Sequence, residues 1–216
     1  MPRVAVVDYG SSNLRSVAKA LEYVADGQHE VVVSSSAEEI LEAARIVFPG
    51  QGAIGDCMRS LYNCGLIEVL VEGIRTRPFL GICLGLQSLM SRSDEDNGVA
   101  CLDVYPGQVR RFRDNAGPAA GGSPRKIPHM GWNEVRWRRS HPVNEGIPSG
   151  TRFYFVHSYY VVPRDDDLIM GETDYIDRFV SALATGNAFA TQFHPEKSAD
   201  AGLRLLRNFL AWNGVA

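Results

Sequence analysis

The first 85 residues repeat one pattern, in which a short apolar run is followed by a stretch with helical spacing. The apolar runs are RVAVV, HEVVV, RIVFPG and RPFLGI, all rich in Val, Ile, Leu or Phe. The stretch SSNLRSVAKALEYV and the residues near 55–75 place apolar side chains on one helical stripe instead. Buried strands that alternate with helices predict a parallel sheet that is covered on both faces.

The second half of the chain is patterned mainly as strands. Its strand-like segments are GQVRRF, NEVRWR, TRFYFVHSYYVV, DRFVSALATG and NAFATQFHPE. They predict antiparallel strands added to the parallel ones, and AGLRLLRNFLAW predicts a closing amphipathic helix. Residues 114–126 are rich in Gly, Pro and Ala, which predicts a surface loop. We expect one α/β domain over 1–216, with a mixed, largely parallel central sheet and helices on both faces.

Composition and charge exclude several classes of function. The formal net charge is −3, from 25 acidic and 22 basic residues without long blocks of one sign, so no footprint for nucleic acid is present. No apolar run is long enough for a membrane span or a signal-peptide core, so we expect a cytoplasmic protein. The four cysteines show neither CxxC nor Cys/His metal spacing. We therefore expect no disulfide, no metal and no cofactor.

One cysteine, Cys83, stands between two glycines where an apolar run should give way to a helix. The segment GICLG, residues 81–85, matches the G-x-S-x-G nucleophile elbow with Cys in place of Ser. A nucleophile on such a sharp turn needs neighbours without bulk, which Gly81 and Gly85 supply. A helix start there favours the reactive thiolate, and the backbone N–H of Leu84 can donate to an oxyanion. The alternative is a small buried hydrophobe, the interpretation that we accept for the other three cysteines.

A thiolate nucleophile needs a proton carrier, and one of the five histidines stands in suitable company. His194 ends a strand-like segment and is followed by Pro195 and Glu196. A residue before proline is pushed towards extended geometry, and residues i and i+2 of an extended chain face the same side. We therefore predict that Glu196 reaches the His194 imidazole and completes a triad with Cys83. For the His-Pro-Glu tripeptide alone, a surface turn is the alternative.

With GICLGLQ and FHPE in this order, the chain resembles the class I glutamine amidotransferases, whose Cys-His-Glu triad strips ammonia from glutamine. The glycine-rich oxyanion loop of that family is matched by FPGQGA, residues 48–53. The resemblance implies that Gly50, Gln51 and Gly52 form this loop and help to hold glutamine, with a backbone N–H of Gln51 or Gly52 in the oxyanion hole. Gln51 replaces the small apolar residue that the family has there. The family's glutamine-binding residue falls on Gln87, for which an exposed polar helix residue is the alternative.

Within that class, DYGSSNLRSV, KIPHMGWNEV, YFVHSYY and QFHPEKS resemble the glutaminase subunits of imidazole glycerol phosphate synthases, which serve histidine biosynthesis. The resemblance implies a separate (β/α)₈ barrel cyclase as the partner that receives the ammonia. It implies that Ser158 and Tyr159 help to bind glutamine. The residues implied to lie near the partner are Asn13, Met130, Trp132, Tyr160 and Lys197. The alternatives are that Asn13 caps a helix, that Trp132 packs in a core and that Lys197 is solvated.

Other functions fit parts of this pattern. A stand-alone cysteine hydrolase, such as a γ-glutamyl hydrolase, would use the same elbow without a partner, although an α/β-hydrolase usually carries its acid well before the histidine. A non-enzymatic subunit on the same scaffold, or a glutaminase that serves anthranilate or purine synthesis, is also open. For a glutaminase that feeds a partner we expect slow turnover alone and an oxyanion loop that is not fully formed, because hydrolysis without a waiting acceptor wastes glutamine.

Overall fold

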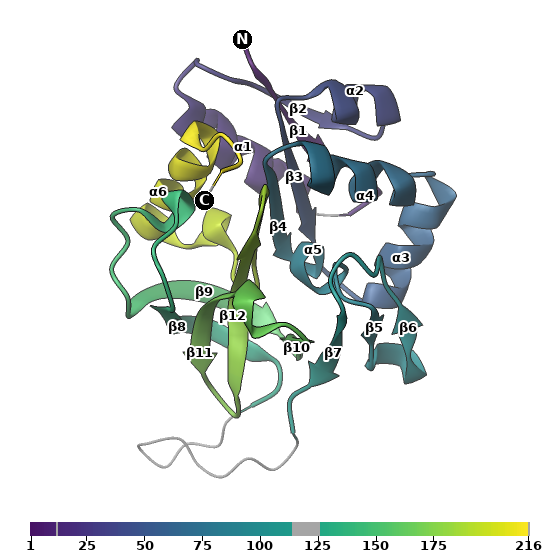
Figure 1. The fold of residues 1–216 in the computed structure, drawn as a ribbon, viewed down its shortest axis with the longest axis vertical. Coiled ribbons are helices and arrows are strands. Elements are labelled where there is room, and N and C mark those ends of the chain that lie inside the picture. The colour runs from purple at the N-terminus through teal and green to yellow at the C-terminus, as the bar shows by residue number, and fades with distance from the viewer. Residues whose placement is uncertain (12, 114–125, 216) are drawn as a thin grey trace.

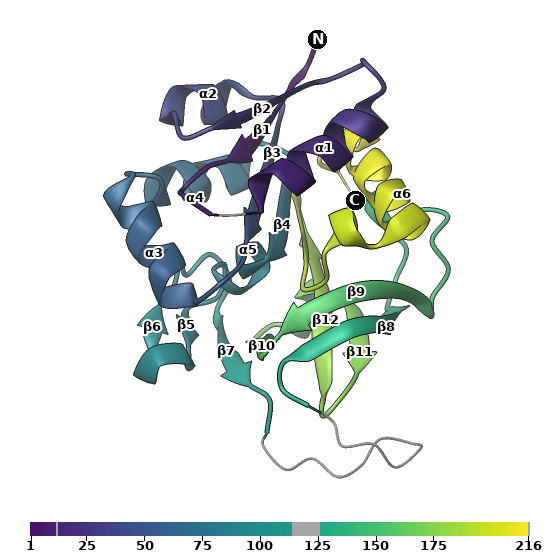
Figure 2. The same ribbon diagram turned by 180° about the vertical axis from the view of Figure 1, so that it is seen from behind.

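The computed structural model describes residues 1–11, 13–113 and 126–215 (Figure 1). The surface loop predicted over 114–126 lies outside the described residues, apart from Lys126. Within the described ranges, no helix is long and apolar enough to cross a membrane. The described chain forms one mixed sheet with helices packed against its parallel part (Figures 1 and 2).

Five parallel strands form one half of this sheet, in the order β2-β1-β3-β4-β13. They are β1 (Arg3–Val7), β2 (Glu30–Ser34), β3 (Arg45–Gly50), β4 (Phe79–Cys83) and β13 (Ala188–Thr191). Because side chains alternate along a strand, Val4 and Val6 of β1 enter one core, whereas Ala5 and Val7 enter the other. Burial on both faces explains why most of these strands are nearly continuous apolar runs.

Helices cover the two faces of the parallel strands separately. Helices α1 (Leu14–Ala25) and α6 (Ala199–Ala211) lie side by side on one face, as Figure 2 shows, and bury their apolar stripes in the core that holds Val4. On the other face lie α2 (Ala37–Glu42), α3 (Ile54–Asn63) and α4 (Ile67–Thr76). The predicted α/β class, with a largely parallel central sheet and helices on both faces, is confirmed.

The other half of the sheet is mainly antiparallel. Beyond β13 the order continues through β12, β10 and β7, while β11 joins β12 to a ribbon made of β8 and β9. The strands of this half are β5 (Arg92–Ser93), β6 (Val99–Ala100), β7 (Gly107–Arg111), β8 (His129–Trp137), β9 (Thr151–His157), β10 (Tyr159–Pro163), β11 (Ile169–Asp174) and β12 (Arg178–Thr185). The segment predicted as one strand is two, because the chain changes pairing partners at Ser158.

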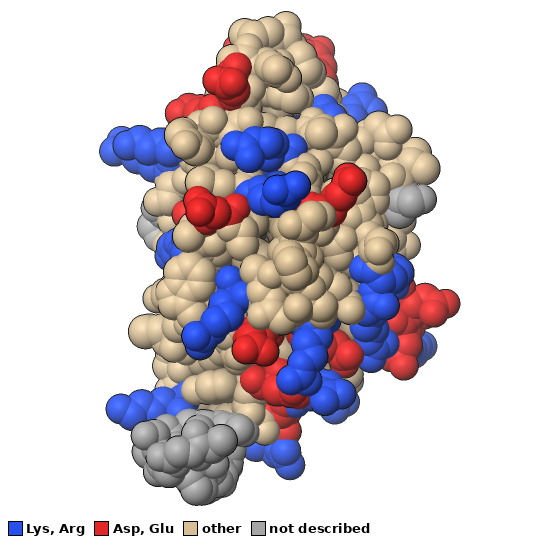
Figure 3. All heavy atoms as spheres, turned by 90° about the vertical axis from the view of Figure 1, so that its left-hand side faces the viewer, with Lys and Arg blue, Asp and Glu red and all other residues tan. Residues whose placement is uncertain are grey.

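Charged side chains of both signs are interleaved on the face drawn in Figure 3. Asp174 of β11 pairs with Arg136 of β8 and with Arg178 of β12, and Glu172 pairs with Arg138. These pairs are largely exposed, so water screens them and each one adds little stability. They tie three neighbouring strands together without creating a region of one sign.

Candidate active site

The elbow predicted at Cys83 is present, and its glycines are sterically required. Cys83 ends β4 with φ +57° and ψ −104°, a strained conformation for a residue with a side chain. A Cβ on Gly81 would lie 2.7 Å from the carbonyl oxygen of Gly85, and a Cβ on Gly85 would overlap the carbonyl oxygen of Phe48. The helix after the elbow, α5 (Leu84–Gln87), is a single turn. The predicted helix dipole therefore adds less than a full helix would, and local N–H groups matter more.

Three neighbouring parallel strands carry the predicted residues to one edge of the sheet. Strand β3 ends at Gly50, which is paired directly with Cys83 at the end of β4. On the other side of β4, Thr191 at the end of β13 is paired with Ile82, and the chain continues from there to His194. The carboxyl ends of parallel strands meet at one edge, which is where ligands bind in open α/β sheets.

His194 and Glu196 form a buried pair, as predicted, but by a different local geometry. The Nδ1 atom of His194 lies 2.8 Å from Oε1 of Glu196, and both side chains are at most 1% exposed. Residues Pro195–Lys197 form a 3₁₀ turn, so the prediction of an extended chain through them is wrong. Proline fits the first position of such a turn because it needs no N–H donor there. The hydroxyl of Ser198 closes the turn by donating to the His194 carbonyl oxygen at 2.6 Å.

Electrostatics favour a charged His194 beside an ionised Glu196. Burial lowers the pKa of His194, but the neighbouring Cys83 sulfur and the Glu196 carboxylate outweigh it and raise the pKa to about 10. Burial likewise raises the pKa of Glu196, but its bond with His194 dominates and the pKa is lowered. The Nε2 atom of His194 makes no hydrogen bond of good geometry to another described residue. It is thus available to the sulfur and to a leaving group.

Asn13 contacts the same oxygen of Glu196 that contacts His194. Asn13 precedes α1, yet its side chain makes no capping hydrogen bond to that helix, so the capping alternative is wrong. Its Nδ2 atom donates instead to Oε1 of Glu196 at 2.6 Å. The two residues are 183 positions apart, and no local pattern could have indicated the contact.

A cavity of about 180 Å³ opens beside Cys83. The predicted residues that line it are Gln51, Gly52, Leu84, Gln87, Ser158 and Tyr159. Gly50 lies buried beneath the loop, where a Cβ would meet the hydroxyl of Tyr9 at 2.6 Å. The cavity is smaller than the roughly 300–1,000 Å³ of drug-sized pockets and suits one amino acid. The sequence prediction therefore found most of the lining.

The cavity also contains residues that the sequence analysis missed. Glu95 lines it, and burial raises the pKa of its carboxyl group. The Oε2 atom of Glu95 accepts a hydrogen bond from the backbone N–H of Ile54 at 2.9 Å, at the start of α3. A carboxylate at this position can attract the α-ammonium group of an amino acid. His157 lines the cavity as well.

Gln87 is 3% exposed, so the alternative of an exposed polar helix residue is wrong. Its Nε2 atom donates to the carbonyl oxygen of Tyr159 at 3.0 Å and to Oε1 of Gln192 at 3.1 Å. Gln192, which was not predicted, donates from Nε2 to the Cys83 sulfur at 3.6 Å. Two buried amides therefore link the Tyr159 carbonyl group to the thiol.

Two of the predicted interface residues project from the exposed side of β8. Met130 is 64% exposed and Trp132 is 44% exposed, so the alternative of a core tryptophan is wrong. The Trp132 ring contacts the ring of Tyr154 edge-on, and the Tyr154 carbonyl oxygen accepts from the backbone N–H of His194 at 2.9 Å. An apolar surface therefore adjoins the histidine.

The other predicted interface residues differ in their surroundings. Lys197 is exposed, which agrees with the alternative that this residue is solvated. It lies on the turn that carries Glu196. Tyr160 is half-buried, with its ring 4.8 Å from that of Phe112 and 6.1 Å from that of Phe179. The Tyr160 ring thus contributes to the interior of the antiparallel half.

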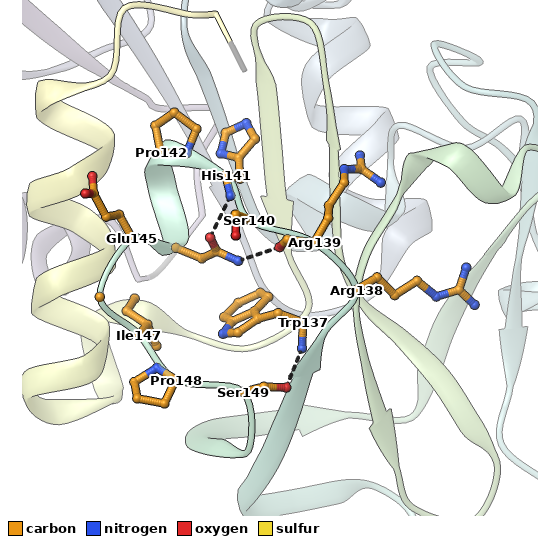
Figure 4. A pocket seen from close by; sticks show the side chains of 12 residues that line it. Trp137, Arg138, Arg139, Ser140, His141, Pro142, Glu145, Ile147, Pro148 and Ser149 are labelled. Carbon is orange, nitrogen blue, oxygen red and sulfur yellow. Dashed lines mark hydrogen bonds between the residues drawn. The ribbon is translucent and has the colours of Figure 1, made fainter.

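A larger cavity, of about 880 Å³, lies in the loop between β8 and β9 (Figure 4). Asn144 holds this loop by donating to the Arg139 carbonyl oxygen and accepting from the backbone N–H of His141. Figure 4 shows the Arg139 side chain directed away from the cavity, and its guanidinium donates to two backbone carbonyl groups. None of the predicted site residues lines this cavity, so size alone does not mark the functional site.

Comparison with known families agrees with this geometry. The family described as glutamine amidotransferase class-I matches residues 5–212, and the chain belongs to that family. A solved glutamine amidotransferase superposes with a TM-score of 0.70 at 18% identity, covering 98% of this chain and 99% of the other. A glutamine amidotransferase of Thermotoga maritima gives 0.63 at 17%, covering 97% and 83%. Identity this low supports the fold alone.

Curated relatives narrow the family further. The imidazole glycerol phosphate synthase subunit HisH of Aromatoleum aromaticum is 56% identical over 98% of this chain and 99% of its own. The HisH subunit of Nitrosococcus oceani is 53% identical over 100% of both chains, and that of Nitrosomonas europaea is 51% identical over 98% and 99%. Within the class-I family, the chain falls among the HisH subunits.

Proposed function

We propose that this chain, as a single domain over 1–216, hydrolyses glutamine with Cys83, His194 and Glu196 and passes the ammonia to a (β/α)₈ cyclase that makes imidazole glycerol phosphate. The main support is a thiol next to a buried His–Glu pair, beside a cavity the size of one amino acid. Full-length similarity to HisH subunits favours this acceptor over anthranilate or purine synthesis, and over a stand-alone hydrolase.

The first half of the reaction forms a thioester. Cys83 attacks the side-chain amide carbon of glutamine, and the carbonyl oxygen takes up negative charge. Backbone N–H groups of Leu84 and of the Gln51–Gly52 loop stabilise this oxyanion, since all three residues line the cavity. His194 then gives its Nε2 proton to the departing nitrogen, the C–N bond breaks and ammonia leaves.

The second half releases glutamate. His194, now neutral, removes a proton from water, which attacks the thioester and expels the Cys83 thiolate. The thiolate and the reprotonated imidazole restore the starting ion pair. Throughout, Glu196 keeps Nδ1 of His194 protonated and stabilises the imidazolium through its 2.8 Å contact.

In the substrate complex, polar groups on the cavity wall hold the amino-acid end of glutamine. Glu95 faces the α-ammonium group, while Ser158 and Tyr159, which line the same cavity, present backbone groups. Gln87 has both Nε2 hydrogens engaged, so only its oxygen remains to accept from the substrate.

The partner docks on the side where Met130 and Trp132 are exposed. Trp132 is the kind of amphipathic aromatic anchor that is enriched at protein interfaces. Asn13 and Lys197 belong to the same region, because Asn13 bonds to the turn that carries Lys197. Ammonia then passes to the partner near Glu196. We propose a cytoplasmic location, since the catalytic thiol must remain reduced.

Covalent labelling tests the nucleophile. An electrophilic glutamine analogue should modify Cys83 and block turnover, and C83S should neither react nor hydrolyse glutamine. Exposed Cys64 provides the control within the same chain, because a general thiol reagent should label it in both proteins. Labelling of another cysteine by the glutamine analogue, or turnover by C83S, would refute the assignment.

Titration with a cyclase tests which synthase receives the ammonia. It also tests the expected gating, in which glutamine turnover is slow until the partner binds. Glutamine turnover should rise when the cyclase and its nucleotide ligand are added, and W132A should need a higher cyclase concentration for the same rise. Equal turnover with and without the cyclase would refute the gating, and stable complex formation only with a non-barrel synthase would refute the acceptor.

A further inference from the structure

The proposed reaction leaves one buried polar side chain at the nucleophile unexplained. Gln192 is fully buried and directly follows β13, whose other residues before Thr191 are apolar. Its backbone N–H is bonded to the Ser181 carbonyl oxygen at 2.9 Å, so its position follows the sheet. Its side chain reaches the Cys83 sulfur, with Nε2 3.6 Å from Sγ. We propose that Gln192 is a positioning residue that orients Cys83 and stabilises its thiolate by an N–H···S hydrogen bond.

The direction of this hydrogen bond follows from the neighbouring amide. The Tyr159 carbonyl oxygen can only accept, so the Gln87 atom 3.0 Å from it must be nitrogen. The second hydrogen on that nitrogen points to Gln192, whose nearer atom at 3.1 Å must therefore be oxygen. The remaining terminal atom of Gln192 is nitrogen, and it faces the sulfur. The hydrogen-bond partners thus fix the orientation of both amides.

The Tyr159 carbonyl oxygen is itself held in place by a second donor. Nδ1 of His157 lies 2.8 Å from it, and Nε2 of His157 lies 3.0 Å from Nδ1 of His129. Asn133 completes the series, with Nδ2 3.3 Å from Nε2 of His129. With both rings neutral, each histidine donates from Nδ1 and accepts at Nε2, so all contacts of the series are satisfied together and the carbonyl group to which Gln87 is bonded has little freedom to turn.

A donor beside sulfur acts on the charged form of the thiol. A hydrogen bond to a charged group is stronger than one to a neutral group, so an N–H aimed at Sγ stabilises thiolate over thiol. The other titratable groups that face Cys83 are Tyr9, Glu95, His157 and the His194 pair. Substitution of Gln192 by methionine leaves these groups in place and adds no charge, so a change in the pH dependence of Q192M reports the lost N–H.

This inference rests on the proposed function, in which Cys83 is the nucleophile. Alkylation of Cys83 tests the role of Gln192 separately from that function. Iodoacetamide is small and does not depend on glutamine binding, so its pH–rate profile at Cys83, read by peptide mapping, reports the thiolate. Q192M and Q192E should move the midpoint of this profile up by about one to two pH units. Q192E should give the larger shift because its carboxylate repels the thiolate. In glutamine hydrolysis, both variants should lose kcat more than they raise KM.

Three controls make the result specific. T191V removes the hydroxyl bond of the preceding buried residue, which faces the opposite side of the strand, and should leave the midpoint unchanged. Cys64, exposed in the same chain, provides an internal reference for reagent reactivity. Q87M leaves the Gln192 donor in place but removes the amide that orients it, and should cause a smaller upward shift. If Q192M fails to fold, Q192A carries the test, because it also removes the N–H donor and adds no charge.

A wild-type midpoint for Cys83 in folded Q192M or Q192E would overturn the role of Gln192. That outcome would leave the proposed function intact, provided that C83S is inactive. Glutamine turnover by C83S would instead remove the proposed function itself. An equal shift in T191V would show that the effect comes from disturbed packing of β13, and would also overturn the inference.

Discussion

Two buried histidine pairs lie in this molecule, and they are held in opposite charge states. His194 contacts Glu196 at 2.8 Å, and its pKa is raised to about 10 by the Cys83 sulfur and the carboxylate, against the effect of burial. His157 contacts His129 at 3.0 Å, and burial lowers the pKa of His157 to about 3 and that of His129 to about 4. Similar burial thus gives an imidazolium in one place and neutral rings in the other.

The difference comes from the partners and not from depth in the protein. A buried imidazole loses hydration when charged, so it stays neutral unless a fixed negative group compensates. Glu196 provides this compensation for His194, and Asn13 in turn fixes Glu196. His157 instead donates to a backbone carbonyl oxygen and accepts from His129, which suits neutral rings. The charged pair is built to move a proton, whereas the neutral pair is built to hold a position.

Removal of each central histidine should produce the largest contrast between the pairs. H194N should lower kcat for glutamine hydrolysis by about 10⁴-fold or more, because nucleophile and base act as one unit. H157N should lower kcat only a few-fold, since it removes one of two donors to the Tyr159 carbonyl oxygen. Steady-state assays measure the loss of kcat in both variants, and thermal unfolding checks that each variant is folded. Comparable losses would contradict the division of roles.

Neutralising the carboxylate should convert the charged pair into a second neutral one. E196Q should keep the shape of the site but remove the charge that supports the imidazolium, and kcat should fall by roughly 10³-fold, as for the acid of a hydrolase triad. NMR titration of His194 checks the cause. The pKa of His194 should fall in E196Q, and an unchanged value would mean that Glu196 does not set the charge.

The two pairs should affect folding stability with opposite pH dependence. Because the pKa values of His129 and His157 are lowered, the unfolded chain binds more protons than the folded chain below pH 6.5. The free energy of unfolding should therefore drop as pH falls from about 6.5 to 4.5, by up to about 1.4 kcal/mol per pH unit for each histidine. His194 has a raised pKa, so its stabilisation is complete below pH 6.5 and is lost as pH rises towards 10.

Denaturant unfolding at several pH values measures how the free energy of unfolding falls towards acid pH (the acid limb) and towards alkaline pH (the alkaline limb). H157N should make the acid limb less steep, since His129 and His141 still contribute to it, and should leave the alkaline limb unchanged. H194N should make the alkaline limb less steep. Glu196, whose lowered pKa matters only below about pH 4.5, does not enter the acid window chosen here. Identical profiles for H157N and the wild type would show that folding does not shift the pKa of His157.

Removal of the Asn13 side chain should have a much smaller effect than removal of the Glu196 charge. N13A removes one hydrogen bond to Glu196 but leaves its contact with His194, so kcat should fall about 3- to 10-fold and the pKa of His194 should change little. N13D is the matched variant, because a second carboxylate beside Glu196 should be worse than alanine through like-charge repulsion. A fall as large as that of E196Q would mean that Asn13, and not the carboxylate alone, maintains the charged pair.

Much of the site followed from local sequence, for reasons that are now visible. The glycines at 81 and 85 indicated a nucleophile elbow because no side chain fits at either position. His194 and Glu196 are two residues apart, so almost any compact turn lets them meet, and the prediction survived the wrong assumption of an extended chain. Gln87 was predicted from family resemblance, whereas its burial followed from packing.

The sequence by itself determined the parallel strands, the helices on both faces and the elbow that carries Cys83, because these depend on periodicity and on steric limits within a few residues. Only the tertiary structure decided which side chains meet from distant segments, such as Asn13 with Glu196 and Gln192 with Cys83. It also decided the charge of each histidine, since that depends on burial and on partners contributed by other strands. Desolvation and pairing are properties of a three-dimensional neighbourhood, and no local spacing encodes them.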